Sequence, residues 1–432
     1  MGKRGTAWSR RQFLQRAAAG AVAAPAVVAS TALGADGRAP ASGRIAMGFV
    51  GNGGRGNVNL RLLIASKDVQ VLTVCDVDAK ARERTKKVVD ERYGNTDCLA
   101  CDDFRDVVTR EDIDAVDVST PDHWHAIPTI LAAVHGKDIH VEKPLSLTIR
   151  EGREMVEAVR RHGRVCQTGS EGRSNPRCRL ACELVRNKRA GKVREVYVTG
   201  VGGPPGRGVL PGEPVPPGLD WDAWLGPAPW RPYNKAYHPF RWRAFHDFSG
   251  GGMTDWGAHH FDLAQWALGM DDTGPVEIIP PDGKAHKWLT YKYANGVVMY
   301  HVLGGGDVSA LKLGRGVTVV GTEGRISFWY GGLEKTDPPS IAKEPIGPGD
   351  IHLHRCPPGG HERGDFLRSI RTREKPGADV EIGHRTVSVC HLGNIAYWLR
   401  RPLKWDPMKE EFIGDEGANR LVDRPKREPW AL

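Results

Sequence analysis

The stretch IAMGFVGNGGRG at residues 45–56 decides the fold of this chain of 432 residues. Its apolar first half is rich in strand formers, and Gly51, Gly53 and Gly56 follow at once, before a helix-like segment. This is G-x-G-x-x-G between a strand and a helix, the arrangement typical of dinucleotide binding. The first two glycines allow a tight turn and close approach of a pyrophosphate, and the third lets the helix pack on the strand. A Gly-rich turn in an unrelated fold is the alternative.

The residues around this turn indicate which groups would hold the cofactor. Backbone N–H groups at the start of the helix, next to Asn52 and Arg55, would face the phosphates. A second apolar strand over 69–74 leads to Asp76, which lies 20 residues beyond the last glycine. An acid at that place binds the ribose hydroxyls of the adenosine half.

The same acid bears on the choice between NAD and NADP. Asp76 would repel a 2′-phosphate, so we expect NAD. Lys80 and Arg82 are close enough in sequence to meet a phosphate, so NADP stays open as the alternative.

Strands and helices continue to alternate up to about residue 167. Helices are expected near 79–93, 104–109, 123–135 and 148–162, and strands near 115–119, 138–141 and 165–167. This rhythm predicts a parallel, doubly wound sheet, which binds ligands at the carboxyl ends of its strands. Glu142-Lys143-Pro144 falls at one such end. Pro144 disfavours helical geometry at Lys143, so we expect the lysine to reach into the crevice and polarise a substrate hydroxyl; an ordinary surface lysine is the alternative.

Together these features resemble the Gfo/Idh/MocA oxidoreductases, the relatives of glucose–fructose oxidoreductase and inositol 2-dehydrogenase. The resemblance is carried by the dinucleotide-binding start, by the turn TPDHWH at 120–125 and by EKP at 142–144. It implies a nicotinamide cofactor that contacts Thr120, Pro121, His125, Glu142 and Lys143.

The resemblance also implies how the rest of the chain is organised. A nucleotide-binding α/β domain is expected over 44–167, and an α+β domain with an open, mostly antiparallel sheet over 168–432. Strands of that sheet are expected near 276–279, 287–293, 297–302, 317–321 and 325–329, several of them joined by hairpin turns. A last helix near 381–400 is expected to pack against the first domain. A large sheet with one uncovered face suggests a homodimer or homotetramer.

The catalytic residues are expected on a helix of the second domain. Asp255, His259 and Asp262 lie at i, i+4 and i+7 and resemble the inositol dehydrogenase pattern. A histidine flanked by carboxylates on its own face is oriented and kept basic, as a general base requires. His259 would take the hydroxyl proton, Asp255 would position His259 or the substrate, and Lys143 would polarise the same oxygen. A core histidine satisfied by its acidic neighbours is the alternative.

Aromatic residues and arginines gather between residues 221 and 245. Aromatic faces stack on sugar rings and arginines donate to hydroxyls, so a carbohydrate cleft is attractive. For most of these residues, a long loop held down by aromatic packing is the stronger interpretation. The weaker substrate candidates are Arg173, Tyr237, Arg243, Asp262 and His361.

A metal site is not expected. His352, His354 and His361 could mimic a metal triad, but no carboxylate-rich segment accompanies them. The CxxC of Cys98 and Cys101 lacks the second CxxC of a four-thiolate zinc site. Isolated thiols are favoured, and a disulfide stays open.

Residues 1–34 look like an export signal. SRRQFL at 9–14 is a twin-arginine pattern, and the Ala-rich stretch 17–29 that follows is too short to span a bilayer. A short amphipathic helix is the alternative. Five positive residues precede the first acid, so little of the net charge of +9 is left to indicate a nucleic-acid partner. We expect a linker over 35–43, export to the periplasm and no integral membrane segment.

The expected activity is nicotinamide-dependent oxidation of a hydroxyl on a sugar, polyol or glycoside. Free cofactor is scarce outside the cytoplasm, so export favours a cofactor that is retained and regenerated within each cycle. One alternative is a redox-neutral hydrolase or lyase that works by oxidation, elimination and reduction. The resembling family includes NAD-dependent α-N-acetylgalactosaminidases, although their helix motif differs from that of Asp255 and His259. A non-catalytic sugar- or nucleotide-binding protein is the other alternative, disfavoured by Lys143 and His259.

Overall fold

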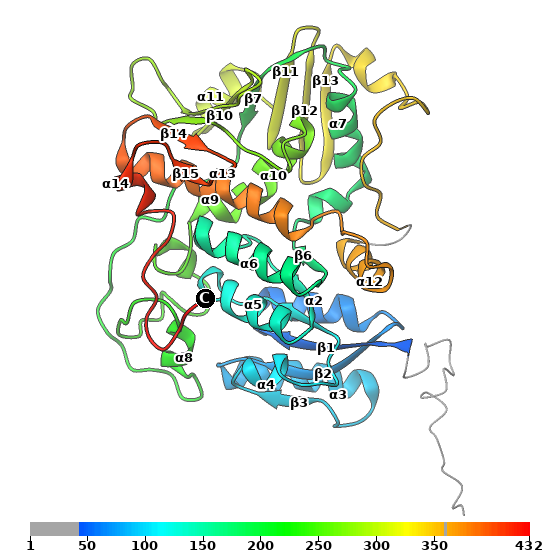
Figure 1. Cartoon of the computed structure of the whole chain (residues 1–432), viewed down its shortest axis with the longest axis vertical. Coiled ribbons are helices and arrows are strands. Elements are labelled where there is room, and N and C mark those ends of the chain that lie inside the picture. The colour runs from blue at the N-terminus through cyan, green and yellow to red at the C-terminus, as the bar shows by residue number, and fades with distance from the viewer. Residues whose placement is uncertain (1–42, 358–360) are drawn as a thin grey trace, which may run out of the picture. The chain divides into compact units, whose positions relative to one another are not determined.

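A computed structural model describes residues 43–357 and 361–432 of the chain. Ile45–Leu432 form one compact unit, which contains a six-stranded and a nine-stranded sheet (Figure 1). The expected export signal lies outside the described residues, and so does the expected linker up to residue 42.

The six-stranded sheet is parallel and has the strand order β3-β2-β1-β4-β5-β6. Its strands are β1 (Ile45–Val50), β2 (Val69–Cys75), β3 (Leu99–Cys101), β4 (Ala115–Val118), β5 (Asp138–Val141) and β6 (Cys166–Thr168). They are connected by the helices α2 (Gly54–Ile64), α3 (Ala79–Tyr93), α4 (Arg105–Val108), α5 (Ala126–Val134) and α6 (Ile149–Arg161). The predicted doubly wound domain is confirmed. Its order switches direction between β1 and β4, the place where such sheets bind ligands.

Two glycines allow the chain to turn sharply at this switch point. Gly51 has a φ of +87°, and a Cβ there would lie 2.7 Å from the backbone carbon of Ser119 in the loop after β4. A Cβ on Gly56 would lie 1.9 Å from the carbonyl oxygen of Gly51. Neither position has room for a side chain. With glycine at both, α2 begins directly against the tip of β1.

The nine-stranded sheet has the order β13-β12-β11-β7-β10-β9-β8-β14-β15. Its strands are β7 (Val193–Val198), β8 (Glu277–Ile279), β9 (Leu289–Lys292), β10 (Val298–His301), β11 (Val317–Gly321), β12 (Arg325–Trp329), β13 (Gly332–Asp337), β14 (Leu403–Asp406) and β15 (Glu411–Phe412). Within the described part of the chain β7 and β10 pair in parallel and the other pairs of this sheet are antiparallel, which confirms the predicted sheet. Strands β7, β13, β14 and β15 were not predicted, because they carry charged residues or are short, and β7 pairs with partners far along the chain.

Three helices cover one face of the nine-stranded sheet. They are α7 (Pro176–Arg186), α10 (Gly257–Leu268) and α13 (Val380–Leu399), which share a hydrophobic core with the strands. The helix expected near 381–400 is present as α13. It also packs against α6 and β6, so it joins the two sheets (Figure 1).

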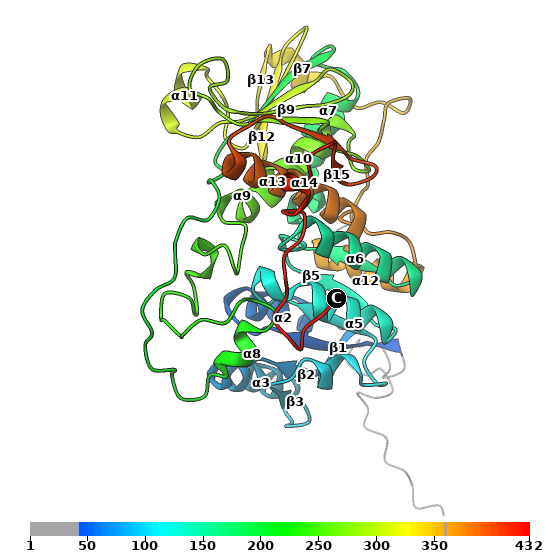
Figure 2. The ribbon, with the colours of Figure 1, turned by 60° about the vertical axis from the view of Figure 1, so that its left-hand side comes forward.

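A long segment over residues 201–251 contains little regular structure apart from α8 (Trp221–Leu225). Figure 2 shows it running from the second sheet to α8, which lies beside α3. We call residues 216–227 the strap. The Ala79 N–H donates to the Gly218 carbonyl at 2.8 Å, and the Asp220 N–H donates to the Val77 carbonyl at 3.1 Å. The strap therefore lies directly over the end of β2.

The first domain contains a buried ion cluster beneath its ligand-binding edge. His140 of β5 lies between two carboxylates: its Nδ1 is 2.7 Å from Asp117 Oδ1, and its Nε2 contacts Glu362 of α12 (Glu362–Thr372). Burial alone would lower the pKa of His140, but Glu362 and Asp117 outweigh it and raise the pKa to about 10. The imidazolium ties α12 to the sheet.

This cluster predicts a pH dependence of stability. An unfolded histidine has a pKa of about 6.5, so the stabilisation by His140 is complete below that pH and declines as pH rises towards 10. We expect His140→Gln to lower the free energy of unfolding by about 3–5 kcal/mol near pH 6, because it leaves buried carboxylates unpaired. Between pH 6 and pH 9 the free energy of unfolding should also decline less in the variant than in the wild type. Urea unfolding at both pH values measures this, with exposed His135→Gln as the control; an identical decline in wild type and His140→Gln would contradict it.

Candidate functional site

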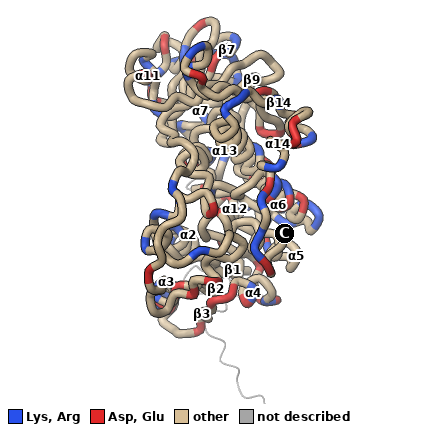
Figure 3. The backbone as a smooth tube through the Cα atoms, turned by 90° about the vertical axis from the view of Figure 1, so that its left-hand side faces the viewer, with Lys and Arg blue, Asp and Glu red and all other residues tan. Residues whose placement is uncertain are grey.

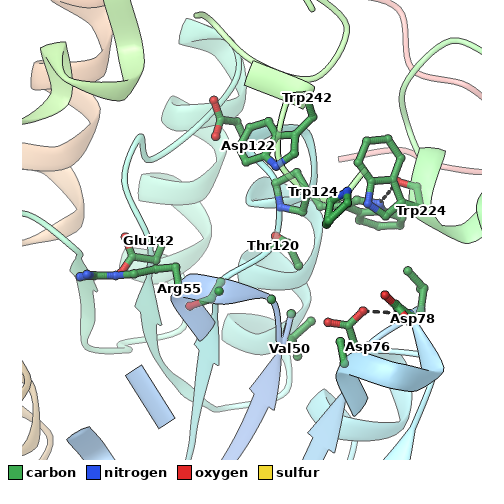
Figure 4. Close-up of a pocket in the computed structure, with 18 of the residues that line it drawn as sticks. Val50, Arg55, Asp76, Asp78, Thr120, Asp122, Trp124, Glu142, Trp224 and Trp242 are labelled. Carbon is green, nitrogen blue, oxygen red and sulfur yellow. Dashed lines mark hydrogen bonds and ion pairs between the residues drawn. The ribbon is translucent and has the colours of Figure 1, made fainter. Parts of the chain in front are cut away.

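A cavity of about 1050 Å³ lies at the carboxyl ends of β1, β2, β4 and β5. The second domain borders it with Trp256, which follows α9 (Gly252–Asp255), with α10, and with the long segment over 201–251. Figure 4 shows Arg55 and Glu142 on one side of the cavity and Asp76 and Asp78 on the other. Its volume is at the upper end of the range for ligand sites in proteins.

The glycine turn leaves room for a pyrophosphate. Gly53 and Gly54 line the cavity, and a Cβ on either would meet no atom within 4 Å. The first turn of α2 has no side-chain cap, so its N–H groups are available to an anion. Gly51 and Arg55 also line the cavity, whereas Gly56 packs under Gly51 and shapes the turn.

Asp76 is fixed in place by backbone donors. The Asn52 N–H donates to Asp76 Oδ2 at 2.6 Å, and the Asp78 N–H donates to Oδ1 at 2.9 Å. Burial raises the pKa of this carboxyl. Asn52 does not line the cavity; its side-chain amide donates to the Cys75 carbonyl at 2.7 Å. Asn52 therefore positions Asp76, a different role from the cofactor contact that its place in the turn suggested.

Of the residues in the turn after β4, Thr120 and Pro121 line the cavity and His125 does not. The two ring nitrogens of His125 lie 2.9 Å from the Thr120 carbonyl and 2.7 Å from the Pro144 carbonyl. The expectation that His125 contacts the cofactor is thus corrected: it is buried and connects the loop of Thr120 to the loop of Lys143.

An ionic network forms one wall of the cavity. The Arg55 Nε is 2.7 Å from Glu142 Oε1, and a second guanidinium nitrogen of Arg55 contacts Glu171. Glu171 also accepts from the Tyr330 hydroxyl and from Arg363. Burial would raise the pKa of Glu171, but the Tyr330 hydrogen bond and Arg55 lower it to about 2. Sequence reasoning missed Glu171 and Tyr330, because neither falls in a motif.

Lys143 and Asp255 form the contact between the two domains at the cavity. The Lys143 Nζ is 2.6 Å from Asp255 Oδ1 and 2.8 Å from the Asp255 carbonyl. Arg243 adds a second cation at 3.3 Å from the same carboxylate oxygen. Burial would raise the pKa of Asp255, but Lys143 and Arg243 lower it below its ordinary value. Asp255 is therefore an ionised carboxylate that holds the Lys143 ammonium.

His259 does not have the carboxylate partners that its spacing suggested. One helix, α9, ends at Asp255, and α10 begins at Gly257, so the two residues are on separate helices. His259 lines the cavity beside the Tyr330 ring, at a centroid distance of 5.1 Å. Among the described residues its buried Nδ1 has no hydrogen-bond partner. Burial and the charge of Lys143 lower the pKa of His259 to about 3, which corrects the expectation that carboxylates keep it basic.

Most of the weaker substrate candidates lie away from the cavity. Arg243 lines it. Arg173 and Asp262 are buried and form an ion pair at 2.8 Å, which fixes α10. Tyr237 is fully buried in the aromatic cluster, and its hydroxyl accepts from the Leu210 N–H at 2.7 Å. His361 is exposed at the start of α12 and is not among the residues that line the cavity.

Comparison with known proteins assigns the family. Residues 45–170 match the model "Oxidoreductase family, NAD-binding Rossmann fold", and residues 204–432 match "Oxidoreductase family, C-terminal alpha/beta domain". The chain belongs to the Gfo/Idh/MocA oxidoreductase family. The resemblance seen in the sequence is thereby confirmed, together with a nicotinamide dinucleotide-binding first domain.

Curated relatives within this family include glycoside hydrolases. An α-N-acetylgalactosaminidase from Shewanella oneidensis is 31% identical over 176 residues, which cover 36% of this chain and 38% of that protein. The chain spans between about a quarter and just over half of the length of the curated relatives that it matches. A glycosyl hydrolase family 109 protein from Saccharopolyspora erythraea is 34% identical over 128 residues, or 27% of each chain.

Solved structures with this fold include sugar dehydrogenases. The myo-inositol 2-dehydrogenase from Lactobacillus plantarum has a TM-score of 0.56 at 18% identity and covers 84% of this chain and 99% of its own. The WlbA dehydrogenase from Bordetella pertussis, in complex with NADH and UDP-GlcNAcA, has a TM-score of 0.58 at 14% identity, with the same coverage. At these identities the likeness concerns the fold alone.

Several cavity residues fall outside the family motifs that the sequence offered. They come from the loop after β3 and from the long segment over 201–251, and they include Phe104, Trp224, Phe240 and Trp242. Trp224 and Trp242 belong both to the buried aromatic cluster around Tyr237 and to the cavity wall, so this cluster supports one side of the cavity.

Three potential metal ligands lie together away from the cavity. Atoms of His354, Cys356 and Asp365 are all within 4.8 Å of one another. The Asp365 carboxylate already accepts from Arg368 and from the Gly377 N–H, so its oxygens are engaged. All eight cysteines are free, which includes the CxxC pair. No helix in the described part of the chain is both long and apolar enough to cross a membrane.

The environment of His259 predicts how it titrates. With a pKa of about 3, its ring should stay neutral from pH 8 down to pH 5. Lys143→Ala removes a charge that lowers this pKa, so the pKa should rise in that variant. Histidine NMR on labelled protein measures both, with the signal assigned by its loss in His259→Gln. A wild-type signal that titrates near pH 6.5 would contradict the burial argument.

Proposed function

We propose that this protein oxidises a hydroxyl of a sugar, polyol or glycoside with a nicotinamide cofactor that stays bound and is regenerated within each cycle. The observation that carries the proposal is the position of Lys143, whose ammonium lies in the same cavity as the glycine turn and Asp76. The sugar-linked neighbours support the substrate class.

The residues present divide the chemistry between them. A bound nicotinamide ring would supply the hydride acceptor. The Lys143 ammonium, held by Asp255, would donate to the substrate hydroxyl and stabilise the negative charge that develops on its oxygen. His259 would be neutral and therefore able to accept the proton. Lys143 disfavours a cationic His259. The hydroxyl proton would therefore pass to His259 only as negative charge develops on the substrate oxygen that Lys143 contacts.

A redox-neutral glycoside hydrolase or lyase is the second candidate. The matches to an α-N-acetylgalactosaminidase and to glycosyl hydrolase family 109 proteins favour it. In that reaction a bound cofactor would take a hydride from the carbon that bears a ring hydroxyl, and the neighbouring C–H would be lost as a proton while the glycosidic bond eliminates. In a hydrolase, water would then add to the resulting double bond. The hydride would finally return to the carbonyl carbon. Incubation with glycoside panels separates the candidates, since a released sugar without net cofactor reduction indicates cleavage. A protein that binds sugar without either reaction would be a binding protein, the third interpretation.

The proposed export and assembly have their own tests. Residues 1–34, fused to a reporter that is active only after export, should require the twin-arginine translocase. Tyr197, Trp288 and Tyr300 form a half-exposed aromatic group on the sheet face away from the helices. A homodimer or homotetramer through that face would be measured by light scattering.

The roles of Lys143 and His259 predict large losses of activity. Lys143→Ala and His259→Ala should each lower the rate by about 10²–10⁴, because each removes a group that acts on one hydroxyl. The double variant should be little worse than either single one. Asp255→Asn should lose less, since the amide can still accept from Lys143.

The measurement is reduction of bound cofactor, followed by absorbance after a substrate sugar is added. Lys335→Ala, at an exposed lysine of β13, is the control that should keep wild-type activity. Thermal unfolding should be nearly unchanged in the single variants, because they remove polar groups at a cavity. Wild-type reduction by His259→Ala would show that this histidine is not the proton acceptor.

The carboxylates at the adenosine end predict a preference for NAD. Asp76, Asp78, Asp102 and Asp103 line the cavity there together with Arg84 and Arg105, so the carboxylates outnumber the cations; Lys80 and Arg82 do not line the cavity. NADP should therefore bind at least about tenfold more weakly than NAD, or about 1.4 kcal/mol. Asp76→Ala should narrow this ratio, whereas Asp97→Ala, outside the cavity, should not. Calorimetric titration of the wild type and the two variants with NAD and with NADP checks it, and tighter NADP than NAD binding by wild type would reverse the prediction.

A further inference from the structure

We propose that residues 422–430 form a clasp that fastens the strap over the adenosine end of the cavity and supplies Trp430 to its wall, so that a bound dinucleotide leaves only when the clasp opens. This inference rests on the proposed binding of a nicotinamide dinucleotide in the cavity. It assigns the slow exit of that cofactor to named contacts.

The strap is already held against the first domain by its own contacts. Leu219 forms a β-bridge with Asp78. The Trp224 carbonyl accepts from the Trp124 Nε1 and from the His123 Nε2, each at 3.0 Å. These contacts place the strap beside Asp76, where the ribose hydroxyls of the cofactor would lie.

The clasp is anchored at one end to the first domain. The Arg150 N–H donates to the Val422 carbonyl at 3.0 Å, and the Thr148 hydroxyl donates to Asp423 at 3.2 Å. Arg424 lies 3.8 Å from the buried carboxylate of Glu151. Figure 3 shows this charged segment running beside α6 towards the C mark.

At the other end the clasp binds the strap through hydrogen bonds of Arg427. Its guanidinium donates to the Asp222 carboxylate at 2.6 Å, to the Asp222 carbonyl at 2.9 Å and to the Gly226 carbonyl at 2.9 Å. The backbone N–H of Arg427 donates to the Pro227 carbonyl at 3.0 Å. One arginine thus makes four hydrogen bonds to the strap, and such charge-assisted bonds are among the stronger ones.

Trp430 completes an aromatic wall. Its ring lies 4.7 Å from that of Trp124 and 6.3 Å from that of Phe104, and the Arg105 guanidinium lies over it at 5.6 Å. All four residues line the cavity. Phe104 and Arg105 follow β3, the strand beyond β2 and Asp76, so the wall is on the adenosine side. Aromatic faces of this kind stack with bases.

The experiment measures how fast the full-length protein, loaded with NADH, releases it. Release is followed by the loss of bound-NADH fluorescence when an excess of a second NADH-consuming enzyme traps the free cofactor. Trp430→Ala and Arg427→Ala should each speed release by about tenfold or more. Trp230→Ala is the matched control, because Trp230 is 67% exposed and does not line the cavity.

The outcomes separate this inference from the proposed function. Release at the wild-type rate by both variants overturns the clasp and leaves cofactor binding intact. A wild-type protein that holds no NADH overturns the proposed function itself. Hydrogen exchange gives an independent readout without substitutions: bound NADH should slow amide exchange in residues 422–430, and unchanged exchange there would also overturn the clasp.

Discussion

The positive charge of Lys143 is the constraint on which the site depends. It sits after β5 and reaches across to Asp255 at the end of α9, so this ion pair helps to join the two domains where their cavity lies. The same charge lowers the pKa of both Asp255 and His259. It keeps the carboxylate ionised and the imidazole neutral. Lys143 thus places a fixed cation beside His259 in the cavity, which suits an oxygen that gains negative charge.

The parts of this site that the sequence predicted are those in which a local pattern determines the geometry. The turn at Gly51 and Gly56 could be predicted because backbone crowding there excludes any side chain. Asp76 followed from its distance to that turn, and Lys143 from the proline after it. Each prediction used residues close together in the chain, and the structure places all of them at one end of the first sheet.

The parts that the sequence did not predict depend on contacts between distant segments. The spacing of Asp255, His259 and Asp262 fits one helix, but the helix is interrupted at Trp256, and the two carboxylates pair with other residues than His259. Asp262 pairs with Arg173, 89 positions away, and Asp255 pairs with Lys143, 112 positions away. The spacing of residues along the sequence does not reveal pairs that lie so far apart. The clasp could not be predicted for the same reason, since residues 422–430 have no periodicity and their position depends on contacts with the strap and with α6.

The enclosure of the cavity bears on which reactions the proposed mechanism permits. Aromatic side chains close the adenosine end, whereas the rings of Phe240 and Trp256, also in the cavity wall, are 75% and 42% exposed. Lys143 and Arg243 line the same cavity, so a sugar that enters past these exposed rings would meet the cation that polarises its hydroxyl. Under the proposed clasp, a cofactor held behind Trp430 would not be exchanged in each turnover. The hydride that it takes would then return to a sugar in the same cavity, either to a second substrate or to the first one after a bond has been eliminated. Transhydrogenation and redox-neutral cleavage would both meet this condition, and both would use the oxygen-stabilising charge of Lys143 in each direction of hydride transfer.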